Sequence, residues 1–211
     1  MNLGDGAPYR TVREPGRAEW KEKGSRFLAF IEPCPDLPRA EARIHDCRDR
    51  HTDATHVCWA WRLRTEPDPG EASSDAGEPA GTAGVPMLGT LRSARVWDVL
   101  GIVVRWYGGT NLGRGGLIRA YRGVLADAVE AAQVVEALPR VRVTAAAPMG
   151  RVGDLHRVLS VLGAEYGEQR VGGGEVLQDV VVPLRDLERL DDMITEATHG
   201  EGRVLRGEGM G

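Results

Sequence analysis

Apolar positions in the first half of the chain follow two different periods, which predicts both strands and helices there. A period near two, or a short continuous apolar run, indicates strands at residues 9–12, 27–31, 56–63 and 99–104. A period near 3.6 predicts helices at residues 37–50, 85–91 and 117–132. Both faces of the strand at 56–63 carry apolar side chains, so the pattern leaves open which face is buried.

The second half shows strand, helix, strand, strand, helix and strand patterns in that order. The strands are expected at residues 141–145, 165–171, 175–182 and 203–206, and the helices at 152–162 and 187–194. Three glycines at 172–174 mark the turn of a hairpin. This order is typical of a ferredoxin-like βαββαβ domain. The sequence therefore predicts an α+β protein of two domains, residues 1–136 and 137–211.

Two stretches lack these patterns. Residues 64–81 are rich in proline, glycine, serine and acidic residues and have no apolar period, which predicts a mobile acidic loop. Residues 108–116 contain five glycines in nine positions, so we expect an irregular loop throughout, followed directly by the helix at 117.

Composition excludes several classes of protein. Hydrophobic residues make up 42% of the 211 positions and charged residues 27%, and no uncharged apolar run is long enough to cross a bilayer. Residues 1–14 lack the apolar segment of a secretory signal, so we expect a cytoplasmic protein. Cys34, Cys47 and Cys58 match neither a disulfide framework nor a zinc-ligand pattern, and we expect no metal and no other cofactor.

The formal net charge of -4 conceals a strong segregation of charge. Residues 89–123 hold six arginines against one aspartate, whereas residues 165–211 hold five basic against eleven acidic residues. A basic central segment of this kind suits a polyanionic partner, and the acidic end suits a basic one.

The basic segment contains the motif with the clearest chemistry. An apolar strand leads into Gly108-Gly109-Thr110-Asn111-Leu112-Gly113-Arg114-Gly115-Gly116 and then into a helix. Free backbone N–H groups, a helix dipole and nearby arginines together suit a phosphate group. The spacing is neither that of a Walker loop nor that of a dinucleotide fingerprint, and a tight turn that needs positive φ is the alternative interpretation.

Other residues leave similar alternatives. Trp106 and Tyr107 suit either stacking on unpaired bases or packing in the core. His56 and Cys58 provide too few metal ligands even with Asp53, which favours a structural role. Asp75 and Glu78 could hold a cation, a basic partner or a proton, and an acidic solvated loop is the alternative interpretation.

Several stretches together resemble the IMPACT/YigZ family. The matching stretches are Lys23-Gly24-Ser25-Arg26-Phe27, residues 53–58 (DATHVC), residues 74–84 (SDAGEPAGTAG) followed by Pro86, and residues 104–121. The family usually has a second acid where this chain has Ala76, and Tyr-Phe or a similar pair where it has Trp106-Tyr107. The change at Ala76 weakens the hypothesis that paired aspartates hold a metal there.

The resemblance covers nearly the whole chain and implies two folds. The first domain is expected to be similar to domain IV of elongation factor G, from the ribosomal-protein-five superfamily, and the second to the ferredoxin-like domain V of that factor. It also implies a regulatory link to translation, since eukaryotic members compete for a ribosome-associated activator of a stress kinase. Bacterial members resemble nucleic-acid or ribosome binders.

The leading hypothesis is therefore a non-catalytic protein that binds RNA, the ribosome or a ribosome-associated partner. The residues expected to contact RNA or another anion are Arg105, Trp106, Tyr107, Gly108, Gly109, Asn111, Gly113, Arg114, Gly115, Gly116, Arg119 and Arg122. The residues that match family motifs without an assigned role are Arg26, His56, Asp75, Glu78 and Thr82. One alternative is an enzyme or binder that acts on a phosphorylated small molecule or nucleotide through the glycine-rich loop, and another is a protein adaptor.

Overall fold

The computed structural model describes residues 6–64 and 70–205, and the chain separates into two compact units. The first unit is Tyr9–Ala137, and the second comprises residues 138–205 together with residues 6–8. The helices and strands agree with an α+β protein. None of the helices among the described residues is both long and apolar enough to cross a membrane.

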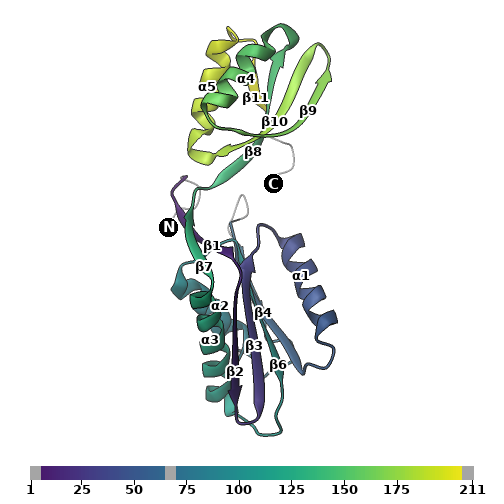
Figure 1. The fold of residues 1–211 in the computed structure, drawn as a ribbon, viewed down its shortest axis with the longest axis vertical. Coiled ribbons are helices and arrows are strands. Elements are labelled where there is room, and N and C mark those ends of the chain that lie inside the picture. The colour runs from purple at the N-terminus through teal and green to yellow at the C-terminus, as the bar shows by residue number, and fades with distance from the viewer. Residues whose placement is uncertain (1–5, 65–69, 206–211) are drawn as a thin grey trace. The chain divides into compact units, whose positions relative to one another are not determined.

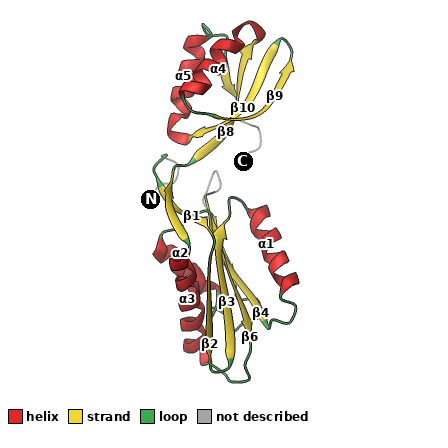
Figure 2. Ribbon diagram, in the orientation of Figure 1, coloured by secondary structure: helices red, strands yellow, loops and turns green. Residues whose placement is uncertain are grey.

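The first unit contains an antiparallel five-stranded sheet between two layers of helices (Figures 1 and 2). Its elements in chain order are β1 (Tyr9–Glu14), β2 (Gly16–Glu22), β3 (Ser25–Pro33), α1 (Leu37–Arg50), β4 (His56–Leu63), β5 (Gly70–Ser74), α2 (Gly84–Ala94), β6 (Val99–Trp106), α3 (Gly113–Ala131) and β7 (Gln133–Ala137). The strand order is β2-β3-β6-β4-β5, and β1 pairs with β7 in a separate two-stranded ribbon.

Both faces of this sheet are covered, which explains the apolar pattern on each face of β4. Cys58 and Ala60 belong to the core beneath α2 and α3, whereas Val57 and Leu63 belong to the core beneath α1. The helices lie on opposite sides of the sheet in Figure 1. The central strand β6 is buried over all its residues except the last, as a strand covered on both faces must be.

The expectation that residues 108–116 form a loop throughout is wrong, because α3 begins at Gly113. Glycine weakens a helix by about 1 kcal/mol per residue relative to alanine. The first turn of α3 is nevertheless held in place because Leu117, Ala120 and Tyr121 are buried in the core directly after it. Tertiary burial therefore outweighs the weak local propensity of the four residues 113–116.

The predicted mobile acidic loop at 64–81 is also wrong where the structure describes it. Gly70–Ser74 forms β5, which pairs with β4 at the edge of the sheet, and an ordered turn follows. Residues 65–69 lie outside the described residues. Hydrogen bonds to β4 therefore order β5, a segment for which the sequence pattern predicts no strand.

The second unit is built from the elements that the sequence predicts, in the same order. They are β8 (Arg140–Pro148), α4 (Val152–Val161), β9 (Glu165–Gly172), β10 (Glu175–Pro183), α5 (Leu187–Ala197) and β11 (Arg203–Leu205). The antiparallel sheet has the order β11-β8-β10-β9, and both helices share one core with β8 and β10. Residue 206, expected in the last strand, lies outside the described residues.

Candidate functional site

The predicted site is divided by the pleat of β6. Neighbouring residues of a strand point to opposite faces of its sheet. Arg105 is paired with His56 of β4 on the face that α2 and α3 cover, whereas Trp106 is paired with Arg26 of β3 on the α1 face. The residues that the sequence groups into one RNA surface therefore lie on two faces, with the glycine-rich loop joined to the first.

On the first face, Arg105 and Glu78 form a buried ion pair. Their relative exposures are 5% and 7%, and Nη1 of Arg105 lies 2.6 Å from Oε1 of Glu78. The Tyr121 hydroxyl donates to the same carboxylate oxygen at 2.8 Å, and Nη2 of Arg105 donates to the Ser25 hydroxyl at 3.3 Å. Glu78 thus offsets the charge of Arg105 inside the fold.

Cys58 lies beneath this network. Its thiol donates to the carbonyl of Asp75 at 3.0 Å and approaches the Tyr121 hydroxyl at 3.4 Å. Burial raises the pKa of Cys58 to about 12 and, as the largest cause, also raises the pKa of Tyr121. Both groups are therefore protonated at neutral pH and serve as hydrogen-bond donors, and a thiol in this state is a poor nucleophile.

Asp75 organises the turn between β5 and α2. Its two carboxylate oxygens accept hydrogen bonds from three backbone N–H groups at 2.7 to 2.9 Å, those of Gly81, Ala83 and Gly84. Burial alone would raise the pKa of Asp75, but these hydrogen bonds and the charge of Arg114 lower it below 3.8. In the same turn, Thr82 donates to the carbonyl of Pro79. Asp75 and Thr82 thus both hold the backbone of this turn in place.

His56 lies where this turn meets the strand. Its Nδ1 is 2.9 Å from the carbonyl of Ala76, a contact in which the ring nitrogen acts as the donor. The other ring nitrogen, Nε2, lies 3.9 Å from the Glu78 carboxylate. No group of three or more His, Cys, Asp or Glu side chains suited to a metal occurs among the described residues.

A pocket of about 470 Å³ opens above these residues. Its walls come from β4, the turn after β5, the end of β6, the glycine-rich loop and the start of α3. The lining residues are Thr55, His56, Glu78, Pro79, Arg105, Tyr107, Asn111, Leu112, Gly113, Arg114 and Leu117. Its volume lies within the range of sites for small organic ligands, about 300 to 1,000 Å³.

The N-terminus of α3 forms one wall of the pocket. Leu112 precedes the helix and provides no side-chain cap, and the first turn has no acidic residue. The N–H groups of this turn carry the positive end of the helix dipole. A Cβ placed on Gly113 or Gly115 would meet no atom within 4 Å, so the backbone borders open space there.

Positive φ explains part of the glycine content of the loop. Gly109 has φ of +83° and Gly113 has φ of +70°, a region that other residues rarely adopt. Gly108 is required for a different reason, since a Cβ there would lie 1.8 Å from the carbonyl carbon of Gly24 in the turn between β2 and β3. The Ser25 hydroxyl also accepts a hydrogen bond from the N–H of Gly108. Turn geometry and an anion site are thus compatible in this loop.

Three predicted arginines are exposed along α3: Arg114, Arg119 and Arg122. Arg114 donates to the carbonyl of Ala80, and neither Arg119 nor Arg122 has an ion-pair partner within the described residues. Gly115, Arg119 and Arg122 are spaced by four and three residues and so share one stripe of the helix. The charge of this stripe is free to meet an anionic partner.

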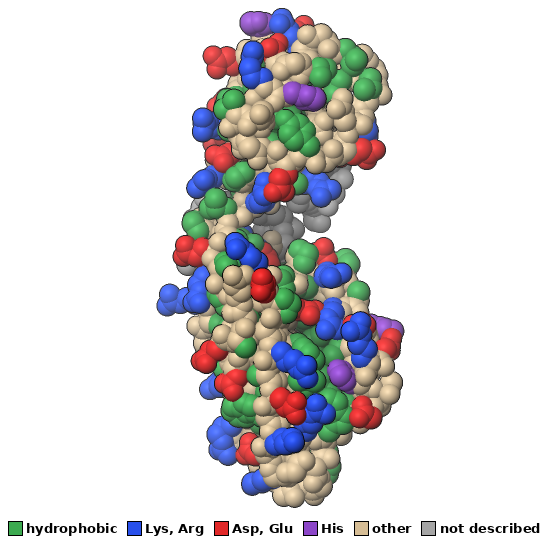
Figure 3. Space-filling view, in the orientation of Figure 1, with side chains coloured by type: hydrophobic (Ala, Val, Ile, Leu, Met, Phe, Trp, Pro, Cys, Tyr) green, Lys and Arg blue, Asp and Glu red, His purple; other side chains and the backbone are tan. Residues whose placement is uncertain are grey.

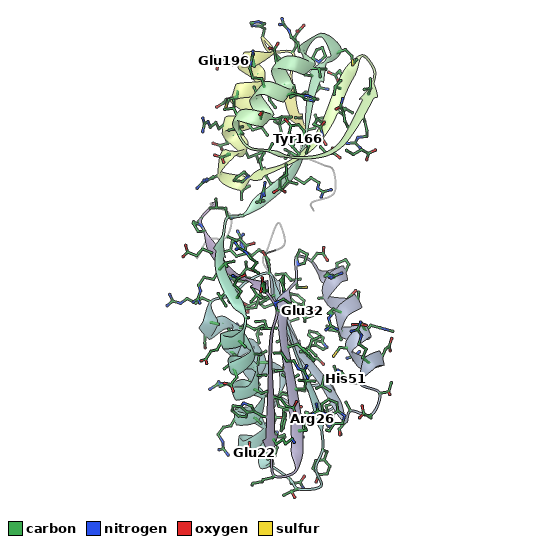
Figure 4. All side chains as sticks on the ribbon, in the orientation of Figure 1. Glu22, Arg26, Glu32, His51, Tyr166 and Glu196 are labelled. Carbon is green, nitrogen blue, oxygen red and sulfur yellow. The ribbon has the colours of Figure 1, made fainter. Side chains whose placement is uncertain are left out.

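Trp106 and Arg26 form a separate surface on the α1 face. The Arg26 guanidinium lies 4.6 Å from the centre of the Trp106 indole, whose N–H donates to Asp53. His51, at the end of α1, approaches the same indole edge-on. Figure 4 labels Arg26 and His51 on this side of the sheet, and Figure 3 shows basic, acidic and apolar side chains intermixed there. Trp106 is thus partly packed, whereas Tyr107 is 45% exposed.

The sequence did not point to three residues of the site. Tyr121 belongs to an apolar helical stripe, and nothing in that stripe indicates that its hydroxyl reaches Glu78. Ser25 and Thr55 lie within matched family stretches, as Tyr121 does, but Ser25 is far from residue 105 in sequence and Thr55 directly precedes a strand. These side chains join the site through contacts between distant segments, which a periodic pattern does not contain.

Comparisons with known proteins give a consistent result. The family model described as the Impact N-terminal domain matches residues 23–129. The chain is 33% identical to the IMPACT family member YvyE of Bacillus subtilis over 205 residues, covering 95% of this chain and 91% of that protein. It is 43% identical to the Escherichia coli IMPACT family member YigZ over 102 residues, covering 48% of this chain and 50% of that protein.

A solved structure titled as that of a hypothetical protein is similar over nearly the whole chain. It has a TM-score of 0.74 at 27% sequence identity and covers 96% of this chain and 98% of that one. The similarity therefore includes both units.

Proposed function

Because the chain belongs to the IMPACT family, we propose that it is a translation-associated accessory protein that binds RNA, the ribosome or a ribosome-associated partner without catalysis. The family resemblance supports the link to translation and, with it, a cytoplasmic location. We further propose the two folds that the resemblance implies. The order β11-β8-β10-β9, with both helices in one core, supports the ferredoxin-like assignment of the second unit.

The observation that supports this function best is the start of α3. Uncapped backbone N–H groups, open space above two glycines and exposed arginines occur together there. These features favour a phosphate backbone, because phosphate groups bind well at helix N-termini and arginines add charge-assisted hydrogen bonds. Arg105 contributes little free charge, since Glu78 is paired with it.

A matched pair of substitutions at Gly115 tests the proposal. This residue occupies the third position of α3 and has room for a side chain. Gly115→Glu adds a carboxylate to the anion site and to the arginine stripe, whereas Gly115→Gln adds nearly the same volume without charge. We expect ribosome co-sedimentation at low salt to be lost with Gly115→Glu and retained with Gly115→Gln.

Salt and charge-removal variants complete the experiment. Association should weaken as salt increases and with Arg114→Ala plus Arg119→Ala, since phosphate contacts release counterions. Arg39→Ala plus Arg48→Ala removes two exposed arginines of α1 and should have little effect. Nuclease-treated samples separate RNA contacts from protein contacts. Free protein under all conditions, or equal binding by the two Gly115 variants, would contradict the proposal.

The pocket favours a second candidate, an enzyme or binder for a phosphorylated small molecule or nucleotide. His56 presents Nε2 near Glu78 at the base of a pocket that the α3 N-terminus also borders. A nucleotide with Mg²⁺ that raises the melting temperature, in the absence of any shift with RNA, would favour this candidate over the first.

A further inference from the structure

Tyr107 is an aromatic ring held at the rim of the pocket. The Arg105 guanidinium lies 5.5 Å from the ring centre, and the Tyr107 N–H donates to the Thr55 hydroxyl at 2.9 Å. Its own hydroxyl is 3.4 Å from the Asn111 side-chain oxygen. These contacts position the ring and still leave 45% of the residue exposed. An exposed but positioned ring suits stacking, because little conformational freedom remains to be lost on binding.

The polar groups around the pocket match the remaining parts of a nucleotide. The free N–H groups of α3 and the Arg114 side chain provide a phosphate site at one wall. Asn111, whose side-chain amide can donate as well as accept, and the His56 ring lie on other walls. A pocket of about 470 Å³ accommodates a ligand of this size.

We propose that this pocket binds one unpaired nucleotide of an RNA strand, with its base stacked on Tyr107 and its phosphate at the start of α3. The inference rests on the proposed function and specifies the form of RNA that the site accepts. A base within a duplex already has neighbours on both faces, so it cannot stack on a protein ring without leaving the helix. The site therefore selects single strands, loops or ends.

Two observations favour a strand over a free nucleotide. Arg119 and Arg122 lie about 7.5 Å and 12 Å beyond Arg114 along the helix axis, on the exposed stripe that begins at Gly115, and so extend the positive charge of α3 beyond the pocket. The charge of Arg105 is offset by Glu78, so of the arginines that line the pocket Arg114 remains for phosphate, which suits a single phosphate better than a triphosphate. Most of the affinity should then come from several weak contacts along a strand.

The experiment measures the binding of a fluorescent eight-nucleotide single-stranded RNA by anisotropy, in parallel with a hairpin duplex and with adenosine monophosphate as competitor. We expect the single strand to bind more tightly than the duplex, and the monophosphate to compete only at far higher concentration. Tyr107→Ala should weaken binding of the single strand by about tenfold, within the range for loss of one stacked base, and Tyr107→Phe should retain it.

Control variants separate this inference from the proposed function. Tyr166→Ala removes a tyrosine of the second unit that is 51% exposed, close to the value for Tyr107, and should leave binding unchanged. Wild-type protein that binds no RNA in any form would overturn this inference together with the RNA form of the proposed function, and would leave a ribosome-associated protein as the partner. RNA binding that is the same for single strand and duplex, or unchanged by Tyr107→Ala, would overturn the inference alone, and tight binding of the monophosphate would replace it with the small-ligand candidate.

Discussion

Arg105 illustrates how burial changes the role of a charged residue. From the sequence it is one of six arginines in a basic segment, yet in the structure its charge is offset by Glu78 and enclosed by the core. Removing one partner of a buried ion pair leaves the other charge unpaired in a medium of low polarity. The Arg105–Glu78 pair should therefore determine the stability of the fold and the shape of the pocket floor, whereas the exposed arginines should determine binding.

We expect Glu78→Ala to lower the free energy of unfolding by about 3 to 5 kcal/mol, because Arg105 would remain buried without its partner. Urea unfolding followed by circular dichroism measures the loss. Glu19→Ala breaks an exposed ion pair with Arg26 and should have a far smaller effect, because solvent screens that pair. Equal losses for the two variants would show that the buried pair has no special role.

The lowered pKa of Asp75 predicts a dependence of stability on pH. The folded state favours the ionised carboxylate of Asp75. As pH falls, the unfolded chain therefore takes up this proton first, below about pH 4, and the folded chain takes it up only at a lower pH. The contribution of Asp75 is complete above that value and is lost as pH falls through its lower folded pKa. Asp75→Asn removes the titration, so its free energy of unfolding should decline less than that of the wild type between pH 4 and pH 2.5.

At the level of elements, α3 contains glycines with opposite structural roles. A Cβ on Gly123 would lie 2.1 Å from the Trp20 ring of β2, whereas a Cβ on Gly115 would meet no atom within 4 Å. Gly123 thus permits close packing of the helix on the sheet. Gly115 leaves the backbone open to a ligand and lowers the stability of the helix.

The same substitution at these two positions should therefore have opposite effects. Gly115→Ala should raise the free energy of unfolding by up to about 1 kcal/mol through helix propensity. Gly123→Ala should lower it by about 1 to 3 kcal/mol, because Trp20 must move away from the helix. Chemical denaturation of both variants measures the difference. If Gly115→Ala instead lowered the free energy of unfolding, the backbone at Gly115 would have to be strained, which the structure does not show.

The elements with a strong period were predictable from sequence, as the agreement at α1, β4, α4 and β10 shows. Elements defined by pairing were not: β5 is polar and at the sheet edge, and β2 exposes most of its charged side chains. The start of α3 was missed because glycines lower helix propensity while the burial of Leu117 lies further along the chain. The glycine-rich loop was recognisable in the sequence. The pairing of Arg105 with Glu78 was not, since 27 residues separate them.

At the level of the whole molecule, the end of the first unit is set by β7. This strand pairs with β1, and Val12 of β1 is almost completely buried. The segment 133–137 thus belongs to the fold of the first unit as well as leading into the second. A chain ending before β7 would expose apolar side chains of β1 and the backbone groups of an unpaired strand.

We expect a fragment of residues 1–137 to fold cooperatively and a fragment of residues 1–131 to melt at a lower temperature. Loss of the β1–β7 pairing and exposure of Val12 cause the difference. Thermal unfolding by circular dichroism compares the two. Similar melting temperatures would indicate that β7 contributes little, and failure of both fragments to fold would show that the first unit depends on the second.

The close approach of Gly24 and Gly108 constrains how relatives of this chain can diverge. Each residue occupies the space that a side chain of the other would need, so their backbones touch across two separate turns. A larger residue at either position requires a new course for the opposite turn, and the glycine-rich loop would then shift relative to α3. In an alignment of relatives, the two positions should therefore vary together, and departures from glycine should coincide with insertions or deletions in the turn between β2 and β3.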